Sequence, residues 1–207
     1  MPHFTYQYVF EAATAPAAPP LLLLHGTGGS EHDLLRLGRS LSPGSALLSP
    51  RGDVSESGSL RFFPRLAEGV FDPAEVTRRT QALADFASAA ASHHAVDLRR
   101  LIAVGFSNGA NVAATLLLLR PEVLGGAILF RPMVVIDQPA AAGTLAGKRV
   151  LLANGSFDPL VPADHPARLA ALLRAGGADV RVHVSPASHA LTSQDLAAAQ
   201  AWLHLTK

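Results

Sequence analysis

The chain has 207 residues, with 17 lysines and arginines against 16 aspartates and glutamates, and it contains no cysteine. A near-neutral charge without a basic run excludes the neutralisation of several phosphates on which nucleic-acid binding rests, so we expect no nucleic-acid partner. The lack of cysteine excludes a disulfide framework, a thiolate zinc site and a cysteine nucleophile, so stability must come from a buried core, which about 200 residues can build.

The first part of the sequence shows no signal for export or for membrane insertion. Residues 1–20 lack the basic region of a signal peptide, and the apolar run Leu21–Leu24 is far shorter than the roughly 20 residues of a membrane span. We therefore expect a cytoplasmic protein without membrane insertion.

Apolar runs of strand length recur along the whole sequence. Alternating aromatic residues from Phe4 to Phe10 predict a half-exposed edge strand, and the alternation in Ala178–Val184 predicts a strand near the other edge. Between them lie five continuous apolar runs that are typical of strands buried on both faces. They are Leu21–Leu24, Ala46–Leu48, Leu101–Val104, Gly126–Phe130 and Val150–Leu152.

Helix-length stretches fill most of the gaps between these runs. They are Glu31–Leu41, Pro73–His93, Asn108–Leu119, Ala163–Ala175 and Ser193–Leu205. The alternation predicts an α/β fold, a mostly parallel sheet with helices on both faces. Because neither a linker nor a repeat interrupts it, residues 1–207 are predicted to form one domain. Ser49–Asp72 is the one long irregular segment, and such loops are usually functional or disordered.

A nucleophile motif follows one of the predicted strands. Gly105-Phe106-Ser107-Asn108-Gly109 lies directly after Leu101–Val104 and directly before a helical stretch. This is G-x-S-x-G in its strand–turn–helix context, where small residues two before and two after the serine let strand and helix pass closely. The helix N-terminus behind Ser107 favours developing negative charge, so Ser107 is the candidate nucleophile.

A serine nucleophile needs an imidazole base and a carboxylate that orients it. In enzymes with this motif the acid and then the histidine follow the serine in the chain. Among the later histidines, His183 lies within a predicted strand, His204 within the last helix and His165 at a helix start. His189 remains, in a loop after the last strand, where ligands approach open α/β sheets.

Asp158 is the candidate acid because, like His189, it lies in a loop directly after a predicted strand. It lies in Gly155-Ser156-Phe157-Asp158-Pro159, just beyond Val150–Leu152. Three other aspartates compete for this role. Asp164 is better explained as a helix N-cap, and Asp179 begins a strand at the opposite edge. Asp137 lies in a loop whose position in the fold the sequence does not predict. The alternative for Asp158 is a turn residue before proline.

A glycine-rich loop supplies candidate oxyanion donors. His25-Gly26-Thr27-Gly28-Gly29 follows Leu21–Leu24, and in this type of enzyme one donor comes from such a loop and one from the residue after the nucleophile. The backbone N–H groups of Thr27 and Asn108 are therefore the candidate oxyanion hole. The loop lacks both nucleotide-binding glycine patterns.

With these motifs in order, the chain resembles the α/β-hydrolases, in particular the small carboxylesterase/phospholipase branch that includes the acyl-protein thioesterases. The resemblance covers nearly the whole chain. It rests on residues 24–29, 49–52, 105–109, 130–132, 155–162 and 188–191. It implies a triad of Ser107, Asp158 and His189, ester hydrolysis without metal or cofactor, and frequently a homodimer.

Ser188 stands where the family commonly has glycine, and Asn108 where its thioesterases often have glutamine. Only about 17 residues separate Phe130 from Lys148, which predicts no large cap domain and an open site.

Candidate substrate contacts lie in and near the long segment. The apolar candidates for covering an acyl or aromatic group are Phe62, Phe63, Leu66, Phe71 and Met133. Their alternative role is to anchor the segment. Arg51 and Arg131 are candidates for contacting a polar alcohol portion, although such arginines more often form structural ion pairs.

The sequence thus predicts a metal-independent serine carboxylesterase acting on a small-molecule ester. Lysophospholipid or acyl-thioester hydrolysis is the near alternative, and a non-catalytic binding protein on the same fold is the remote one. A metal hydrolase using His93 and His94, or His25 and His32, is disfavoured because adjacent helical histidines point to different faces and no H-E-x-x-H spacing is present.

Overall fold

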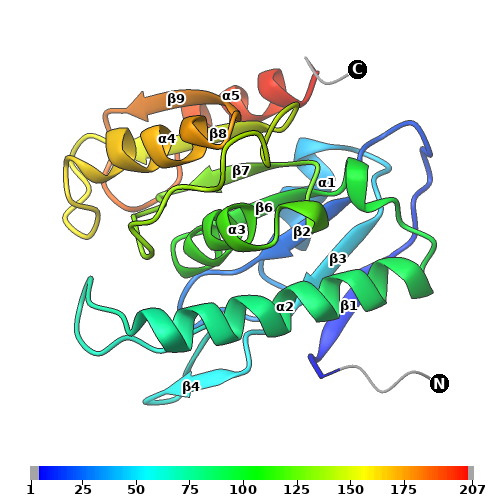
Figure 1. The fold of residues 1–207 in the computed structure, drawn as a ribbon. Coiled ribbons are helices and arrows are strands. Elements are labelled where there is room, and N and C mark those ends of the chain that lie inside the picture. The colour runs from blue at the N-terminus through cyan, green and yellow to red at the C-terminus, as the bar shows by residue number, and fades with distance from the viewer. Residues whose placement is uncertain (1–4, 205–207) are drawn as a thin grey trace.

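The apolar runs of the sequence form the strands of a seven-stranded sheet in the computed structural model, which describes residues 5–204 (Figure 1). The strands are β1 (Tyr8–Glu11), β2 (Leu21–Leu24), β3 (Leu47–Pro50), β6 (Ile102–Phe106), β7 (Gly126–Phe130), β8 (Arg149–Gly155) and β9 (Asp179–Ser185). Their order is β1-β3-β2-β6-β7-β8-β9, with β1 antiparallel to β3 and all other pairs parallel. The predicted mostly parallel sheet is confirmed.

Both predicted edge strands lie at the edges. β1 closes one side of the sheet and β9 the other, and on β9 Val180 is buried while Val184 is 57% exposed. The edge position explains why these two segments alternate, since the central strands are covered on both faces and need no polar side. Phe4, where the first alternation begins, lies outside the described residues.

The helices fall close to their predicted positions. They are α1 (Leu35–Leu41), α2 (Pro73–His93), α3 (Asn108–Leu119), α4 (His165–Ala175) and α5 (Ser193–His204), with short 3₁₀ turns η1 (Leu98–Arg100) and η2 (Pro121–Val123). Only α1 differs much from its prediction, because residues 31–34 form a turn before it. Leu205, the predicted end of the last helix, lies outside the described residues.

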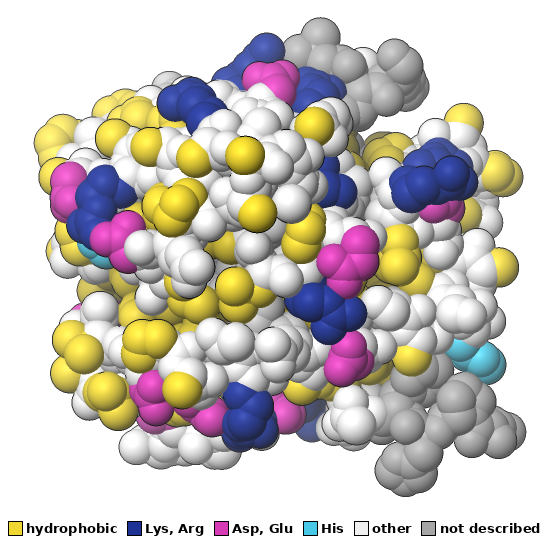
Figure 2. Space-filling model, in the orientation of Figure 1, with side chains coloured by type: hydrophobic (Ala, Val, Ile, Leu, Met, Phe, Trp, Pro, Cys, Tyr) yellow, Lys and Arg dark blue, Asp and Glu magenta, His cyan; other side chains and the backbone are white. Residues whose placement is uncertain are grey.

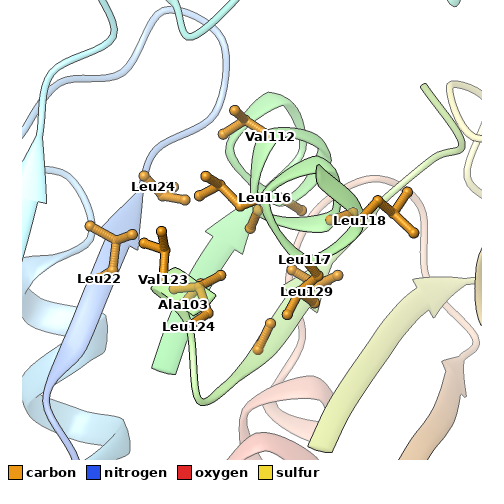
Figure 3. Packing of buried hydrophobic residues seen from close by; sticks show 14 of the residues in the cluster. Leu22, Leu24, Ala103, Val112, Leu116, Leu117, Leu118, Val123, Leu124 and Leu129 are labelled. Atoms are coloured by element: carbon orange, nitrogen blue, oxygen red, sulfur yellow. The ribbon is translucent and has the colours of Figure 1, made fainter. Parts of the chain in front are cut away.

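The helices cover the sheet in two layers (Figure 1). α2, α3 and α4 pack on one face, and α1 and α5 pack on the other, where Trp202 is buried. α3 lies at the centre, and every residue from Asn108 to Leu118 is buried, as expected of a helix composed mostly of apolar residues. Figure 3 shows its leucines packed against β2, β6 and β7. This burial fixes the position of Ser107 at its N-terminal end.

The segment Ser49–Asp72 is more ordered than predicted. It contains an antiparallel hairpin of β4 (Val54–Glu56) and β5 (Ser59–Arg61). The hairpin turns at Ser57 and Gly58, both with positive φ, as the tightest hairpin turns require. The prediction of an irregular loop is therefore wrong for these residues, and the Ser-Gly pair was the available turn signal.

The connection from β7 to β8, residues 131–148, contains no helix or strand. No cap is inserted there over the carboxyl end of the sheet. Among residues 5–204, no helix is long and apolar enough to cross a membrane. On the face shown in Figure 2, basic and acidic side chains lie in small mixed groups separated by hydrophobic ones.

Candidate active site

Ser107 occupies a strained turn between β6 and α3. Its φ is +52° and its ψ is −116°, a conformation that costs a residue other than glycine about 1–3 kcal/mol. The turn is held by hydrogen bonds from the Ser107 N–H to the Phe130 carbonyl and from the Asn111 N–H to the Ser107 carbonyl, both 2.9 Å. The predicted strand–turn–helix is present, and it raises the Ser107 hydroxyl above the carboxyl end of the sheet.

The two glycines of the motif stand where the chain has no room for a side chain. A Cβ on Gly109 would lie 1.9 Å from the Leu24 carbonyl oxygen, and one on Gly105 would lie 2.5 Å from the Gly109 carbonyl oxygen. Both contacts are with backbone, which cannot rotate away. The close passage of strand and helix therefore requires glycine at both positions.

Gly109→Ala is expected to destabilise the protein by about 3 kcal/mol, although alanine ordinarily favours a helix over glycine by about 1 kcal/mol. Overlap of the new Cβ with the Leu24 carbonyl turns this expected gain in stability into a loss. Urea denaturation followed by circular dichroism measures the effect, and Gly58→Ala is the control, because a Cβ there meets nothing within 4 Å and suffers only the strain of its positive φ. A Gly109→Ala variant as stable as the wild type would contradict this account.

A chain of hydrogen bonds joins the three side chains selected from the sequence. The Ser107 Oγ lies 2.9 Å from the His189 Nε2, and the His189 Nδ1 lies 2.8 Å from the Asp158 Oδ2. An ionised carboxylate only accepts, so the Nδ1 carries the proton, and the Nε2 accepts from the serine hydroxyl. The Asp158 side chain is 1% exposed, and its Oδ1 accepts the Leu160 N–H at 2.9 Å. This is the geometry by which a serine is activated.

Three parallel strands place these residues together at the end of the sheet formed by the carboxyl ends of its strands. Ser107 follows β6, Asp158 follows β8 and His189 follows β9, so all three stand at carboxyl ends, where open α/β sheets bind ligands. The Phe106 ring packs against His189 with centroids 5.3 Å apart. The competing histidines are elsewhere: the His165 Nδ1 accepts the Val134 N–H, and His183 lies 3.6 Å from Asp195.

The remaining competitors have structural partners as well. Asp164 is the N-terminal flanking residue of α4 but makes no capping hydrogen bond, and it pairs instead with Arg168, which also binds Asp137. The His94 Nε2 lies 3.1 Å from the Tyr8 hydroxyl. Within the described part of the chain, no three His, Cys, Asp or Glu side chains are grouped so that they could hold a metal ion.

The candidate oxyanion donors line the same cavity as Ser107 and His189. Asn108 is the first residue of α3, where a backbone N–H has no acceptor within its own helix. The Thr27 N–H has no hydrogen-bond acceptor among residues 5–204 either. Both N–H groups are therefore free to bind an oxygen that develops negative charge.

His25 fastens the loop that carries Thr27. Its Nε2 accepts the Gly52 N–H at 2.9 Å, so its Nδ1 carries the proton and donates to the Gly26 carbonyl at 2.7 Å. Burial lowers the pKa of His25, which favours the neutral form that this pair of bonds requires. The Gly28 N–H donates to the Leu60 carbonyl at 2.9 Å. The hairpin thus holds the loop from the other side.

The cavity at Ser107 has a volume of about 250 Å³. Of the predicted apolar contacts, Phe71 and Met133 line it, whereas Leu66 does not and is 73% exposed. The prediction for Phe62 and Phe63 is corrected: they are 1% and 0% exposed and belong to the core, where they anchor the segment. The other lining residues are not predicted from the sequence; they are Arg61, Arg65, Glu68, Phe106, Asn111 and Leu160.

Two of the missed residues carried a usable signal. Asn111 follows the nucleophile by one helical turn, so it lies on the same side of α3. Phe106 is the last residue of β6, at the carboxyl end of the sheet where the nucleophile stands. Arg61, Arg65, Glu68 and Leu160 reach the cavity only through the hairpin and the loops, and no local pattern marks them. A second cavity, of about 550 Å³, lies between α4 and β9, and neither Ser107 nor His189 lines it.

The predicted substrate contact of Arg131 is also corrected. Its side chain is 0% exposed and forms an ion pair with the buried Asp195, with the Nη2 2.6 Å from the carboxylate. The same guanidinium donates to the carbonyls of Ser188 at 3.2 Å and Ala190 at 2.7 Å. These two residues flank His189, so Arg131 holds the histidine loop from within. Arg51 likewise pairs with Glu31, at 2.5 Å.

The Arg131–Asp195 pair predicts a contribution to stability that depends on pH. Burial alone would raise the pKa of Asp195, but hydrogen bonds from Arg131, Thr192 and Ser185 outweigh it and lower the pKa to about 2, from an ordinary 3.8. Because the folded-state pKa is the lower one, the contribution of about 2 kcal/mol is complete above pH 4 and is lost as the pH falls through 2.

Urea denaturation at a series of pH values from 7 to 2 checks this prediction. The control is the double variant Arg131→Met/Asp195→Leu, which lacks the titrating group. We expect its free energy of unfolding to fall by about 2 kcal/mol less than that of the wild type between pH 4 and pH 2. Equal losses would show that Asp195 is not a source of the acid sensitivity.

The chain is similar in sequence and in fold to known proteins. The sequence profile of the phospholipase/carboxylesterase family matches residues 69–207. The chain is 44% identical over 196 residues to the putative hydrolase MhqD of Bacillus subtilis, covering 95% of this chain and 96% of that one. The crystal structure of the Bacillus cereus carboxylesterase has a TM-score of 0.94 at 39% identity, covering 98% of this chain and 95% of the other. The Mesorhizobium loti carboxylesterase has a TM-score of 0.90 at 32% identity, with coverages of 99% and 97%.

Proposed function

The chain belongs to the phospholipase/carboxylesterase family and is a hydrolase, and we propose that it is a serine carboxylesterase that cleaves small to medium carboxylic esters through an acyl-enzyme. The observation that carries this proposal is the continuous chain of hydrogen bonds from Asp158 through His189 to Ser107. In the proposal these three residues form the catalytic triad.

In the first half of the reaction, the Ser107 Oγ attacks the ester carbonyl carbon while the His189 Nε2 takes the hydroxyl proton. The Asp158 carboxylate stabilises the imidazolium that forms. The tetrahedral intermediate then collapses, its C–O bond to the alcohol breaks, and His189 returns the proton to the leaving alcohol. The acyl group remains on Ser107 as an ester.

In the second half, water attacks the acyl carbon with His189 again acting as the base, and the carboxylic acid is released. In both halves the carbonyl oxygen becomes negatively charged. The N–H groups of Thr27 and Asn108 are the donors proposed to bind it. Donors fixed in advance by the backbone need no rearrangement as the charge develops, which makes such a site effective.

The size of the cavity supports small to medium substrates. A volume of about 250 Å³ lies just below the range of typical ligand pockets, which run from about 300 to 1,000 Å³. A long acyl chain would have to extend beyond it. This supports short esters over lysophospholipids, while acyl-thioesters with small acyl groups remain compatible with the same chemistry.

Hydrolysis of p-nitrophenyl esters from acetate to palmitate, at pH 8 with and without a chelator, tests the proposal. We expect short and medium chains to give the highest kcat/KM, with no effect of the chelator. Peptide mass spectrometry after treatment with a fluorophosphonate is expected to place the phosphonate on Ser107. A maximum of kcat/KM at long chains would favour the lipid hydrolase. The absence of both turnover and labelling would favour a binding protein.

A further inference from the structure

One wall of the cavity carries a buried positive charge. Arg61, the last residue of β5, is 4% exposed and lines the cavity together with Ser107, Thr27 and His189. A guanidinium is held so deep only when its donors and its charge are compensated, because removing an unpaired charge from water costs several kcal/mol. The partners of Arg61 therefore indicate what it can bind.

The protein satisfies only part of the guanidinium. The Nε donates to the Phe63 carbonyl at 3.1 Å, and the Nη1 donates to the Thr27 Oγ1 at 2.6 Å. The Nη2 has no hydrogen-bond acceptor among residues 5–204. Since an arginine presents five N–H donors, three of them remain for a ligand.

The charge of Arg61 is also compensated only in part. Its nearest carboxylate is Glu56, at 3.5 Å from the Nε, and that carboxylate is bound more closely by Arg65, at 2.6 Å. Arg65 has a second partner in the exposed Glu68, so its own charge is matched twice. Burial lowers the pKa of Arg61, yet an arginine stays protonated at neutral pH, so Arg61 presents a positive charge to a cavity that Arg65 and the acidic Glu68 line as well.

A second donor lines the same cavity. The Asn111 side chain is 4% exposed, and its Oδ1 accepts the Met133 N–H at 2.8 Å. This bond fixes the orientation of the amide, and its Nδ2 is left without an acceptor among residues 5–204. The remainder of the wall is mixed, with the apolar Phe71 and Met133 beside the charged Arg65 and Glu68. Donors without an acceptor in the protein, set among apolar side chains, can orient a small ligand.

We propose that Arg61 binds a carboxylate of the substrate, so that the preferred esters carry a free acid group. These are monoesters of dicarboxylic acids or esters of alcohols that themselves bear a carboxylate. The inference rests on the proposed esterase function and adds the substrate class. Arg61 and a carboxylate form a charge-assisted pair in a site that water enters only partly, and such pairs are stronger than neutral hydrogen bonds.

Two matched pairs of substrates test the proposal, one for each side of the ester bond. On the acyl side, mono-p-nitrophenyl adipate is compared with p-nitrophenyl hexanoate. On the alcohol side, 4-acetoxybenzoate is compared with its methyl ester. In at least one pair, the wild type is expected to prefer the acid, in kcat/KM, by about 10- to 100-fold, the range expected for a hydrogen bond to a charged group.

Arg61→Gln is expected to remove this preference, so that kcat/KM for the acid falls by about 10-fold or more beyond any loss on the neutral ester of the pair. Arg61→Lys should keep part of the preference, since it retains the charge without the fork of donors. Arg39→Gln is the matched control, because it removes one positive charge from an exposed pair with Glu11, away from the cavity. It should leave the preference unchanged.

The outcomes separate this inference from the proposed function. If both pairs show no preference in the wild type, the carboxylate site is overturned, whatever the variants do. If Arg61→Gln lowers both members of a pair equally, Arg61 only positions Thr27, and the site is again overturned. In either case, Ser107-dependent cleavage of the neutral esters leaves the proposed esterase intact. Cleavage of those esters that persists in Ser107→Ala would overturn the esterase mechanism itself.

Discussion

Replacing Ser107 by alanine is expected to lower kcat for p-nitrophenyl acetate by at least about 10⁴-fold, with little change in stability. In the proposed mechanism the Oγ forms the bond to the acyl carbon, and triads lose most of their rate enhancement when one member is removed. Among residues 5–204 the hydroxyl hydrogen-bonds only to His189, whose side chain is 21% exposed, so its loss leaves no fully buried group without a partner. Steady-state kinetics and thermal denaturation measure both effects.

Ser188→Ala is the control for this substitution. Ser188 precedes His189 directly and is exposed, and within the described part of the chain its side chain makes no hydrogen bond, while its backbone carbonyl accepts from Arg131. The control should keep a kcat within about twofold of the wild type, as is usual for surface substitutions. Equal activity in Ser107→Ala and the wild type would show that another residue is the nucleophile.

Arg131→Met is expected to lower the free energy of unfolding by about 3–5 kcal/mol. Methionine fills much of the volume but leaves the Asp195 carboxylate, which is 0% exposed, without its counter-charge. The carbonyls of Ser188 and Ala190 also lose their donors. Because these residues flank His189, we expect kcat to fall as well, by about 10-fold or more, the scale at which small misplacements of a catalytic group affect rates. Urea denaturation and kinetics at 15 °C, where the variant remains folded, measure the two effects.

The double variant Arg131→Met/Asp195→Leu separates stability from positioning. Exchanging a whole buried ion pair for apolar residues is often neutral, so we expect it to recover most of the lost stability. The donors to the histidine loop remain absent, so kcat should stay low. A double variant that recovers both stability and kcat would show that Arg131 has no role beyond the ion pair.

Much of the fold follows from local patterns in the sequence. Leu21–Leu24 and Gly126–Phe130 are predicted with the observed ends, because an uninterrupted apolar run of strand length has to be buried on both faces. α2 is predicted with its observed ends because Asp72 and Pro73 mark its start. The alternating segments are at the sheet edges because only an edge leaves part of a strand in water.

The selection of Ser107, Asp158 and His189 also comes from the sequence, through chain order and position after a strand. Parallel strands bring their carboxyl ends to one edge, so residues far apart in the chain meet there without any further signal. The structure places their side chains within hydrogen-bond distance of one another. The motif also predicts that positions 105 and 109 must be glycine, because it fixes the close crossing of strand and helix. In the structure, backbone atoms stand where a Cβ on Gly105 or Gly109 would lie.

The tertiary structure alone decides which charged side chains face the substrate. From the sequence, Arg131 is a plausible ligand contact and Arg61 carries no signal, whereas in the structure Arg131 is sealed against Asp195 and Arg61 lines the cavity. An arginine takes its role from its partners, and here Asp195 lies 64 residues from Arg131 in the chain and Thr27 lies 34 residues from Arg61. Local periodicity determines which segments become strands and helices. The contacts between distant segments determine which buried charges are neutralised within the protein and which one is left for a ligand.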